Sequence, residues 1–572
     1  MATYDLLIRG GTLIDGTGSA AQRADVAVRD GRIVAVGFIE GSGVEEIDAT
    51  GLLVTPGFVD IHTHFDGQAI WDSRLAPTTW HGVTTVVMGN CGVGFAPVRA
   101  SDRERLVALM EGVEDIPHPC LAEGLDWEWE SFDDYLRAVE RRTHDADICA
   151  LLPHAALRLY VMGERALRLE AATVDDMARM RALAAEAMRG GALGFSTSRT
   201  IGHKTLAGDP IPSLRAAEQE LTQIALGMAD AGHGIFEVIS DWDAPDVESE
   251  FALFRRVVEA SGRPALVSVT QRYHQPDVWR QLLALARKAS AEGVPMRTVV
   301  APRPIGILLG LEGTQNPFSG TRTYREIVDL PLHERVRRMR DPAIRARMLA
   351  DDPMEFNTFA LLPRLSNERI FPLGEPIDYA PPRERSVAAI AAREGREAAD
   401  VAFDLLLEDD GRALLFAPVV NYLDYDLAAC GEMILDPNAL FGLGDGGAHV
   451  GFITDASFPS YLLAHWARDV AVLPVEEVVR RLTRANAEAV GLEDRGLLAP
   501  GFKADINLID LDEVRLQRPY LVHDLPAGGT RLMQRADGFV MTILSGSVTY
   551  RDGLPTEHLP GQLVRGPQRP SA

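Results

Sequence analysis

The segment GFVDIHTHFDG, residues 57–67, ends an apolar run with two histidines placed two positions apart. The run that leads into it, LLVTPGFVDI, is typical of a buried strand punctuated by Pro56 and Gly57. Side chains alternate along a strand, so residues i and i+2 point to the same side. His62 and His64 can therefore aim two imidazoles at one point, which is the geometry that a divalent metal needs.

Helical segments such as VDDMARMRALAAEAMRG, residues 174–190, separate this strand from others like it. Strands that alternate with helices indicate a parallel sheet. Eight of them is the number in a (β/α)8 TIM barrel, and we predict that α/β fold. The eight predicted strands span residues 54–64, 84–90, 147–154, 192–198, 234–240, 265–271, 295–302 and 440–449.

Both ends of the chain are rich in short strands with glycine turns, such as ADVAVRDGRIVAVG and GFVMTILSGSVTYRDG. Chain ends often lie close together. We therefore predict a small β-sandwich built from residues 1–56 and 491–566, around a barrel of residues 57–490. The interval from about 305 to 437 is too long for one connection. We interpret it as an insertion that either covers the barrel mouth or packs on a partner, which leaves a homo-oligomer open.

The composition narrows the class of protein. The 572 residues carry a formal net charge of −25, which disfavours nucleic acid and anionic membrane surfaces as partners. Four cysteines in so long a chain indicate a reducing compartment rather than a disulfide framework. The start of the chain lacks a signal pattern, and no run is apolar for long enough to cross a membrane. We expect a cytoplasmic enzyme that acts on a small molecule.

Barrel enzymes act at the carboxyl ends of their strands. One histidine or cysteine at such a position is most often structural, but here five predicted strand ends carry residues suited to metal binding or acid–base chemistry. These residues are His62, His64, Cys91, His154, Arg199, His203, Asp445 and His449. The two histidines at the first strand and the aspartate at the last predict a metal site, with Cys91 as a further ligand.

Several motifs resemble the amidohydrolase superfamily, and within it the N-acyl-D-amino-acid deacylases. They are IRGGTLIDGTG, DATGLLVTPGFVDIHTHFDGQ, GNCGVGFAPV, GLGDGGAHVG and RGLLAPGFKADINLID. The resemblance implies a zinc-bearing barrel in which His62, His64 and Asp445 bind the metal, Cys91 is a metal bridge and Asp445 shuttles the proton. It also implies that His154 and Arg158, in PHAALR, match the family segment GHxxLR.

The sequence departs from that family at two strands. Ile239 stands where the family usually carries a histidine on the fifth strand, and on the sixth Val269 replaces a histidine and Gln271 a lysine. Ile and Val cannot bind a metal. We therefore expect one Zn²⁺ rather than two, unless Glu237, Asp241 or a nearby group substitutes.

The sequence thus predicts a zinc-dependent amidohydrolase that cleaves the C–N bond of an N-acyl (D-)amino acid or a related amide. A metal-activated water attacks, Asp445 moves the proton and His154 supports the oxyanion. We expect Arg158, Arg199, His203, Gln271 and His449 to contact the substrate. Two alternatives stay open, a cyclic-amide hydrolase or non-hydrolytic enzyme on the same scaffold, and a metal-free binding homologue.

Overall fold

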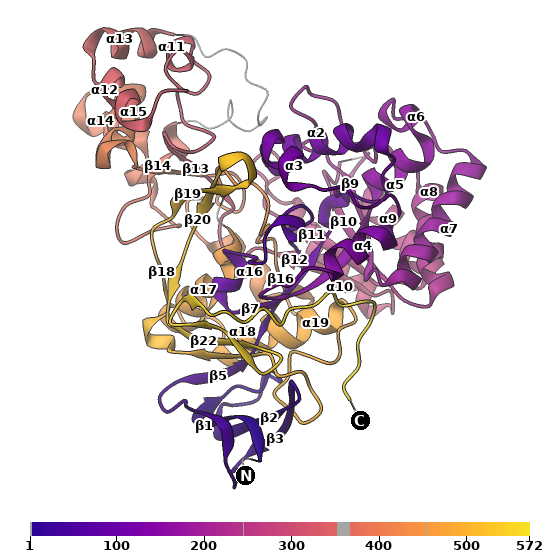
Figure 1. Cartoon of the computed structure of the whole chain (residues 1–572). Coiled ribbons are helices and arrows are strands. Elements are labelled where there is room, and N and C mark those ends of the chain that lie inside the picture. Colours follow the sequence, from indigo (N-terminus) through magenta and orange to yellow (C-terminus); the bar gives the residue numbers. More distant parts are fainter. Residues whose placement is uncertain (1–2, 244, 352–366, 454, 572) are drawn as a thin grey trace.

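The structure is a computed structural model, and it describes residues 3–243, 245–351, 367–453 and 455–571. Eight parallel strands form its centre, in the order β16-β12-β11-β10-β9-β8-β7-β6 (Figure 1). The strands are β6 (Phe58–Asp60), β7 (Val83–Met88), β8 (Asp147–Pro153), β9 (Gly194–Arg199), β10 (Ile235–Ser240), β11 (Ala265–Val269), β12 (Met296–Val300) and β16 (Ala439–Phe441). A parallel bridge between Thr63 and Gly446 joins the two ends of this sheet. The predicted TIM barrel is confirmed.

Helices lie between the barrel strands along the chain and after the last of them. They are α2 (Arg103–Glu114), α3 (His118–Gly124), α4 (Phe132–Glu140), α5 (His154–Met162), α7 (Val174–Gly190), α8 (Glu218–Ala231), α9 (Val247–Ser261), α10 (Val278–Ala291), α16 (Ala428–Leu435), α18 (Val475–Arg480) and α19 (Asn486–Ala489). Helix α7 shows how the sequence sets such bounds. Thr173 and Asp176 form a capping box at its start, and Gly191 ends it with a φ of 117°.

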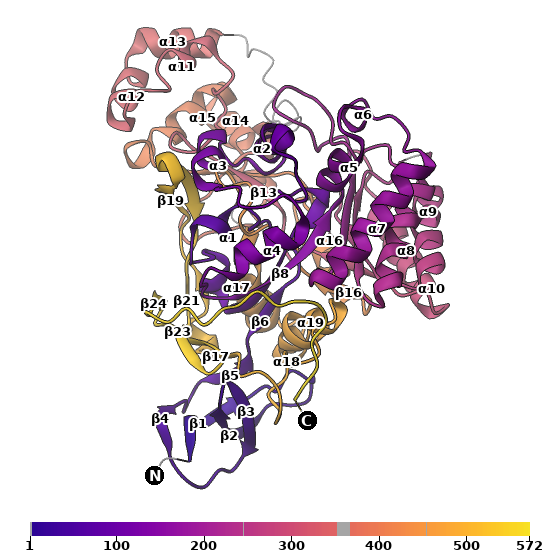
Figure 2. The same ribbon diagram turned by 45° about the vertical axis from the view of Figure 1, so that its right-hand side comes forward.

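The two chain ends share one sheet below the barrel (Figure 2). Its strands are β1 (Tyr4–Leu13), β2 (Gln22–Arg29), β3 (Arg32–Gly37), β4 (Gly43–Asp48), β5 (Leu53–Pro56), β17 (Ile506–Ile509), β22 (Phe539–Leu544), β23 (Ser547–Arg551) and β24 (Leu554–Pro555). Strands β5 and β17 pair antiparallel and so join the N-terminal half to the C-terminal half. The β domain predicted from both termini is confirmed as part of the fold.

The predicted strand 54–64 is two strands. β5 belongs to the terminal sheet and β6 to the barrel, with the break at Gly57. A Cβ on Gly57 would lie 2.2 Å from Thr84 Oγ1, so only glycine fits where the chain passes between the two sheets. The last predicted strand, 440–449, likewise ends at Phe441. His62, His64 and Asp445 therefore lie beyond the strands, on loops at the barrel mouth.

The chain between β12 and α16 forms a separate lobe with its own apolar core, at the end of the molecule farther from the terminal sheet (Figures 1 and 2). It contains β13 (Gly306–Leu309), β14 (Phe371–Pro372), β15 (Leu415–Pro418), α11 (Arg322–Arg325), α12 (Leu332–Met339), α13 (Pro342–Ala350), α14 (Val387–Glu394) and α15 (Ala398–Leu406). Residues 352–366 of the predicted insertion lie outside the described residues.

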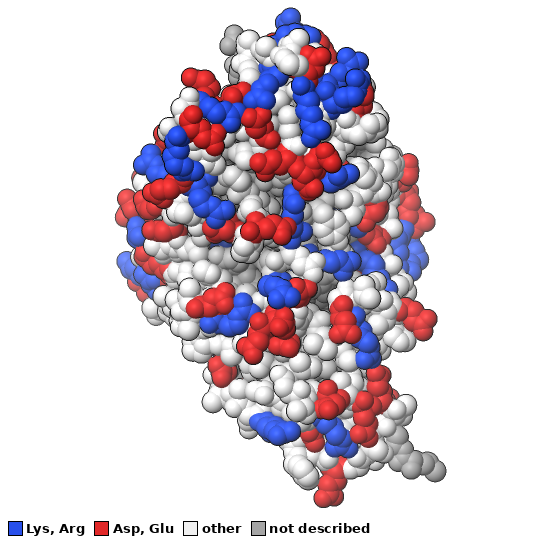
Figure 3. Space-filling view, turned by 90° about the vertical axis from the view of Figure 1, so that its left-hand side faces the viewer, with Lys and Arg blue, Asp and Glu red and all other residues white. Residues whose placement is uncertain are grey.

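Two further observations concern the surface of the molecule. Acidic and basic side chains are interspersed on the face in Figure 3, without a broad patch of either sign. Within the described ranges, no helix is both long enough and apolar enough to span a bilayer.

His81 is buried at a junction of three segments that are distant in sequence. Its Nε2 lies 3.1 Å from the carbonyl oxygen of Gln534, and its Nδ1 lies 2.7 Å from Ser460 Oγ. A carbonyl only accepts, so Nε2 carries the proton and Nδ1 accepts from the serine. Burial lowers the pKa of His81 from 6.5 to about 3. The folded protein therefore holds this imidazole neutral.

We expect His81 to make the fold sensitive to acid. Below pH 6.5 His81 is protonated in the unfolded chain but stays neutral in the folded protein. The free energy of unfolding therefore falls as the pH is lowered from 6.5 toward 3, by up to about 1.4 kcal/mol per pH unit. Urea denaturation at several pH values will show a shallower loss of stability in H81Q than in the unsubstituted protein. The exposed His558 provides the control, since H558Q should keep the original slope. An unchanged slope in H81Q would contradict this account.

Candidate metal centre

A pocket of about 550 Å³, part of it open to solvent, lies at the carboxyl ends of the barrel strands. The residues that line it are His62, His64, Cys91, Glu114, His203, Ile239, Ser268, Thr270, Arg272, Ile305, Leu443, Asp445 and His449. Six of the sequence-predicted site residues meet here: His62, His64, Cys91, His203, Asp445 and His449.

The two histidines of the HTH segment are held by their backbone. The His62 N–H donates to Asp60 Oδ1 at 3.1 Å, and the His64 N–H donates to the Gly446 carbonyl at 2.7 Å. Thr63 points away and donates through Oγ1 to the Val87 carbonyl at 2.8 Å. Because the middle residue faces away, both imidazoles turn toward the pocket, although the segment is not a strand.

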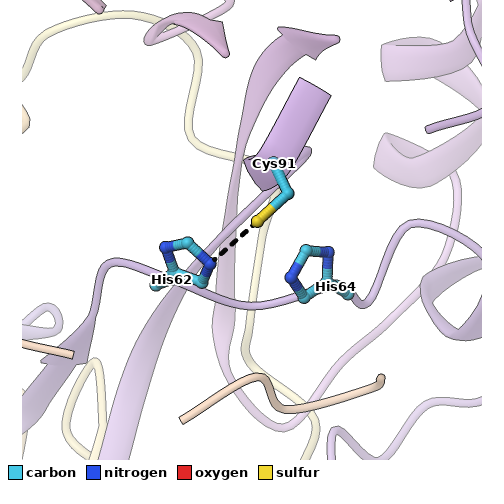
Figure 4. Close-up of side chains that lie close together, drawn as sticks. All are labelled: His62, His64 and Cys91. Atoms are coloured by element: carbon cyan, nitrogen blue, oxygen red, sulfur yellow. Dashed lines mark hydrogen bonds between the residues drawn. The ribbon is translucent and has the colours of Figure 1, made fainter. Parts of the chain in front are cut away.

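Cys91 follows β7 in the left-handed region, with a φ of 54°. Its N–H donates to Glu237 Oε2 at 3.0 Å, and this bond holds the tight turn GNCG against β10. Gly89, with a φ of 81°, has no room for a Cβ, which would lie 2.4 Å from the Leu151 carbonyl oxygen. The turn carries the Cys91 sulfur to 3.4 Å from His62 Nε2 (Figure 4).

Asp445 completes the cluster from the loop after β16. Its Oδ1 lies 3.3 Å from His62 Nε2 and 3.6 Å from His64 Nε2. Burial would raise the pKa of this carboxyl, but the His64 and His62 imidazoles outweigh burial and bring it well below its usual range. The carboxylate is therefore ionised at neutral pH.

These donors suit a zinc ion. His62, His64 and Cys91 are all buried, and their ligand atoms lie within 4.8 Å of one another. A tetrahedral zinc with bonds of ~2.0–2.3 Å separates its ligand atoms by roughly 3.3–3.8 Å. Three separations fall in this range: Cys91 Sγ to His62 Nε2 at 3.4 Å, and Asp445 Oδ1 to His62 Nε2 at 3.3 Å and to His64 Nε2 at 3.6 Å. Burial and the nearby Glu237 raise the pKa of the Cys91 thiol well above its ordinary value, so it needs a cation to become a thiolate.

Glu114 is a site residue that sequence reasoning missed. It ends α2 and is buried, with Oε1 3.3 Å from His64 Nδ1 and Oε2 3.7 Å from His449 Nε2. Burial raises its pKa to about 7 despite the favourable charge of His64. A carboxylate behind a metal-binding imidazole orients the ring and increases its basicity. The one signal in the sequence is an acidic residue at a helix carboxyl end, where the helix dipole disfavours it.

The two other pocket histidines are neutral at physiological pH. Burial lowers the pKa of His203 to about 3 and that of His449 to about 4. The His203 Nδ1 lies 2.9 Å from Ser198 Oγ, so Nε2 is the ring nitrogen that can reach a substrate.

The structure does not bring His154 and Arg158 to the pocket. Both side chains are buried behind β9 and share Glu220: His154 Nε2 lies 2.9 Å from Oε1, and Arg158 Nε donates to the same oxygen at 2.8 Å. Thr197 Oγ1 engages the other nitrogen of His154 at 2.8 Å. These bonds occupy both ring nitrogens and hold the start of α5 against α8.

Arg199 and Gln271 also lie outside the pocket lining. The Arg199 guanidinium makes two bonds to Glu250, at 2.7 and 3.2 Å. The Gln271 N–H donates to Asn421 Oδ1 at 2.7 Å, and its Oε1 accepts from the Leu423 N–H at 3.2 Å. Gln271 therefore fastens β11 to the chain that returns from the insertion.

Among the described residues, the pocket wall at the fifth and sixth strands carries no imidazole. Ile239 lines the pocket, as expected from its position. The expectation for Val269 was wrong by one residue, because its side chain is buried in the core between barrel and helices, while Ser268 and Thr270 face the pocket. Glu237 is buried beneath Cys91, and its Oε1 lies 3.9 Å from His62 Nδ1. Burial raises the pKa of Glu237 to about 8.

The chain is similar in sequence to known proteins. Residues 45–550 match the Amidohydrolase family. D-aminoacylase of Alcaligenes xylosoxydans xylosoxydans is 28% identical, over 89% of this chain and 88% of that protein. N-acyl-D-glutamate deacylase of the same organism is 26% identical, over 98% and 96%.

A solved structure agrees in fold. N-acyl-D-glutamate deacylase from Bordetella bronchiseptica, complexed with zinc and a phosphonate inhibitor, aligns with a TM-score of 0.65 and 24% identity, over 98% of this chain and 99% of that one. The resemblance stated from the motifs is confirmed, and with it the expected class, a hydrolase of carbon–nitrogen bonds other than peptide bonds. The chain belongs to the amidohydrolase family.

Proposed function

We propose that this amidohydrolase uses one zinc ion to cleave the amide bond of an N-acyl amino acid, with the D-enantiomer preferred. The observation that carries the proposal is the convergence of His62, His64, Cys91 and Asp445 at one end of the pocket. Relatives named D-aminoacylase and N-acyl-D-glutamate deacylase support the substrate class. One ion is favoured because Ile239, Ser268 and Thr270 offer the opposite wall no imidazole.

In this proposal the four side chains hold the zinc ion, which when bound polarises the substrate carbonyl and lowers the pKa of water. Asp445 has its carboxylate beside both imidazoles, so it can accept a proton from the attacking water and pass it to the leaving nitrogen. The His203 Nε2 can donate to the oxygen on which negative charge develops. His154 takes no part, since Thr197 and Glu220 occupy both its ring nitrogens.

We expect His62 to be required for zinc and for activity together. The purified protein should hold about one zinc per chain, lose activity to a chelator and regain it with zinc. H62A should lose both the bound zinc, measured by mass spectrometry, and the hydrolysis of N-acyl-D-amino acids, whereas H558A at an exposed histidine should keep both. Activity that survives complete removal of metal would refute the proposal, and a protein that takes up no metal would favour the metal-free binding homologue.

We expect Glu114 to strengthen zinc binding without touching the ion. E114Q keeps the shape of the side chain but removes the charge beside His64, so the zinc dissociation constant should rise by about 10- to 100-fold. Competition with a chromophoric chelator measures this constant. E104Q, on the exposed side of the same helix, is the matched control and should leave it unchanged. An unaltered zinc affinity in E114Q would show that the carboxylate does not support His64.

A further inference from the structure

The loop after β16, residues 442–451 and here termed the metal loop, has a hollow on each side. On one side lies the pocket of the metal centre. On the other lies a cavity of about 340 Å³, part of it open to solvent, and Asp445 lines both. A chain between two hollows has few neighbouring atoms to pack against, so individual hydrogen bonds must hold it in place.

The backbone of the metal loop is also strained. Leu443, Asp445 and His449 have φ values of 59°, 46° and 49°, in the left-handed region that favours glycine. Residues other than glycine keep such a conformation only where the surrounding structure imposes it. The position of Asp445 beside the two imidazoles therefore depends on the bonds that fix this loop.

Three segments supply these bonds. The segment after β6 holds the middle of the metal loop through the Gly446 carbonyl. The end of α2 holds its last residue, since the Gly451 N–H donates to Asp115 Oδ2 at 3.3 Å. The third segment is a hairpin near the carboxyl end of the chain, in which the Leu532 N–H donates to the Val450 carbonyl at 2.6 Å.

This hairpin consists of β19 (Tyr520–Leu525) and β20 (Gly529–Met533), which form a two-stranded sheet of their own. In the sequence it lies between β17 and β22 of the terminal sheet, and in the fold it reaches the barrel beside α3 (Figures 1 and 2). Its tip contacts that helix, where the Ala527 N–H donates to Glu123 Oε1 at 3.0 Å. The hairpin therefore connects the terminal β domain to the metal loop.

Arg531 joins the hairpin to the other half of the metal centre. Its guanidinium donates twice to Asp524 on β19, at 2.7 and 2.8 Å. Its Nη1 also donates to the Ala76 carbonyl at 3.4 Å, and its Nη2 lies 3.4 Å from Asp72 Oδ2. Asp72 and Ala76 belong to the chain that continues from the HTH segment. One buried guanidinium thus links the hairpin to the segment that supplies the two histidines.

We propose that this hairpin positions the metal loop, with Arg531 and Leu532 as positioning residues, and so sets both the affinity for zinc and the place of Asp445 in the proton transfer. The inference rests on the proposed function. Arg531 holds the Leu532 N–H against Val450 on the side where the cavity leaves the loop little packing. Without this arginine the metal loop can move into the cavity, and Asp445 moves away from the imidazoles with it.

The test removes the guanidinium and measures metal binding and turnover. R531M should raise the zinc dissociation constant about 10-fold in competition with a chromophoric chelator, as for the loss of other groups that orient a ligand. The visible absorption spectrum of the cobalt-loaded protein should change too, because it depends on which atoms surround the ion. For an N-acyl-D-amino acid, kcat should fall roughly 10-fold at an unchanged KM, since displacing the proton acceptor slows the chemical step. R531K should recover part of each change, because its ammonium can still reach Asp524.

R535M is the matched control. Arg535 lies at the base of the same hairpin and donates to the Gly553 carbonyl at 2.8 Å and to the Tyr520 hydroxyl at 3.2 Å. R535M should leave the zinc dissociation constant, the cobalt spectrum and kcat unchanged. D524N is a second variant, at a carboxylate that is 49% exposed, so it can be measured even if R531M does not fold. It should cause smaller changes in the same direction.

A zinc affinity and a cobalt spectrum that stay constant in R531M, or that change equally in R531M and R535M, would overturn the inference. If R531M does not fold, unchanged values in D524N would overturn it. Failure of the proposed function gives a different result, because the unsubstituted protein would then bind zinc without hydrolysing the substrate, and the zinc affinity and cobalt spectrum of the variants would still decide. An unsubstituted protein that takes up neither metal would refute both proposals.

Discussion

Closure of the barrel is the constraint on which the site depends. The loops that follow the first and last strands meet where Thr63 pairs with Gly446 and the His64 N–H donates to the Gly446 carbonyl at 2.7 Å. Thr63 lies between the two histidines, and Gly446 follows Asp445, so the residues that close the barrel also set the imidazoles beside the carboxylate. Gly446 also lies against Thr78, and a Cβ there would be 2.2 Å from Thr78 Oγ1, so only glycine fits at this position. A single backbone hydrogen bond adds about 1 kcal/mol of net stability, so its importance here is geometric.

Buried carboxylates surround the cluster in a way that a cation explains. Glu114, Glu237 and Asp60 lie behind His64, Cys91 and His62. Burial raises the pKa of each, to about 7, 8 and 7 respectively. Burying several ionised carboxylates away from water destabilises the fold unless a nearby positive charge stabilises them. A zinc ion at the centre would supply that charge. The three carboxylates lie next to its ligands and would be stabilised by it.

The pocket lies at the boundary between the barrel and the inserted lobe. Ile305, just before β13, contributes to the lining, and Gln271 holds the returning chain at Asn421 and Leu423. The next residue is Arg272, whose guanidinium turns toward β10 instead. The end of β11 therefore contacts both regions. The Gln271 side chain holds the lobe, and the Arg272 side chain lines the pocket with a positive charge.

The sequence by itself determined the barrel, the β domain shared by both termini, and the residues His62, His64, Cys91, His203, Asp445 and His449 that meet in the pocket. Alternation of strands with helices and the position of polar residues at strand ends are local patterns, so the sequence displays them directly. The sequence predicted side-chain direction less well. At the sixth strand the prediction was off by one residue, and because neighbouring residues on a strand face opposite sides, Ser268 and Thr270 face the pocket in place of Val269.

Only the tertiary structure decided which charged groups reach the pocket and which neutralise each other in the interior. Arg158, Arg199 and His154 have the right chemistry for a site, but Glu220 and Glu250 lie close enough in the fold to bind them. Glu114 and Arg272 carry no motif, and each is held at the pocket by a partner far along the chain or on a neighbouring strand. Burial and charge pairing arise from contacts across the fold, whereas the strand-end pattern arises from residues close in sequence, and this difference separates what could be predicted from what could not.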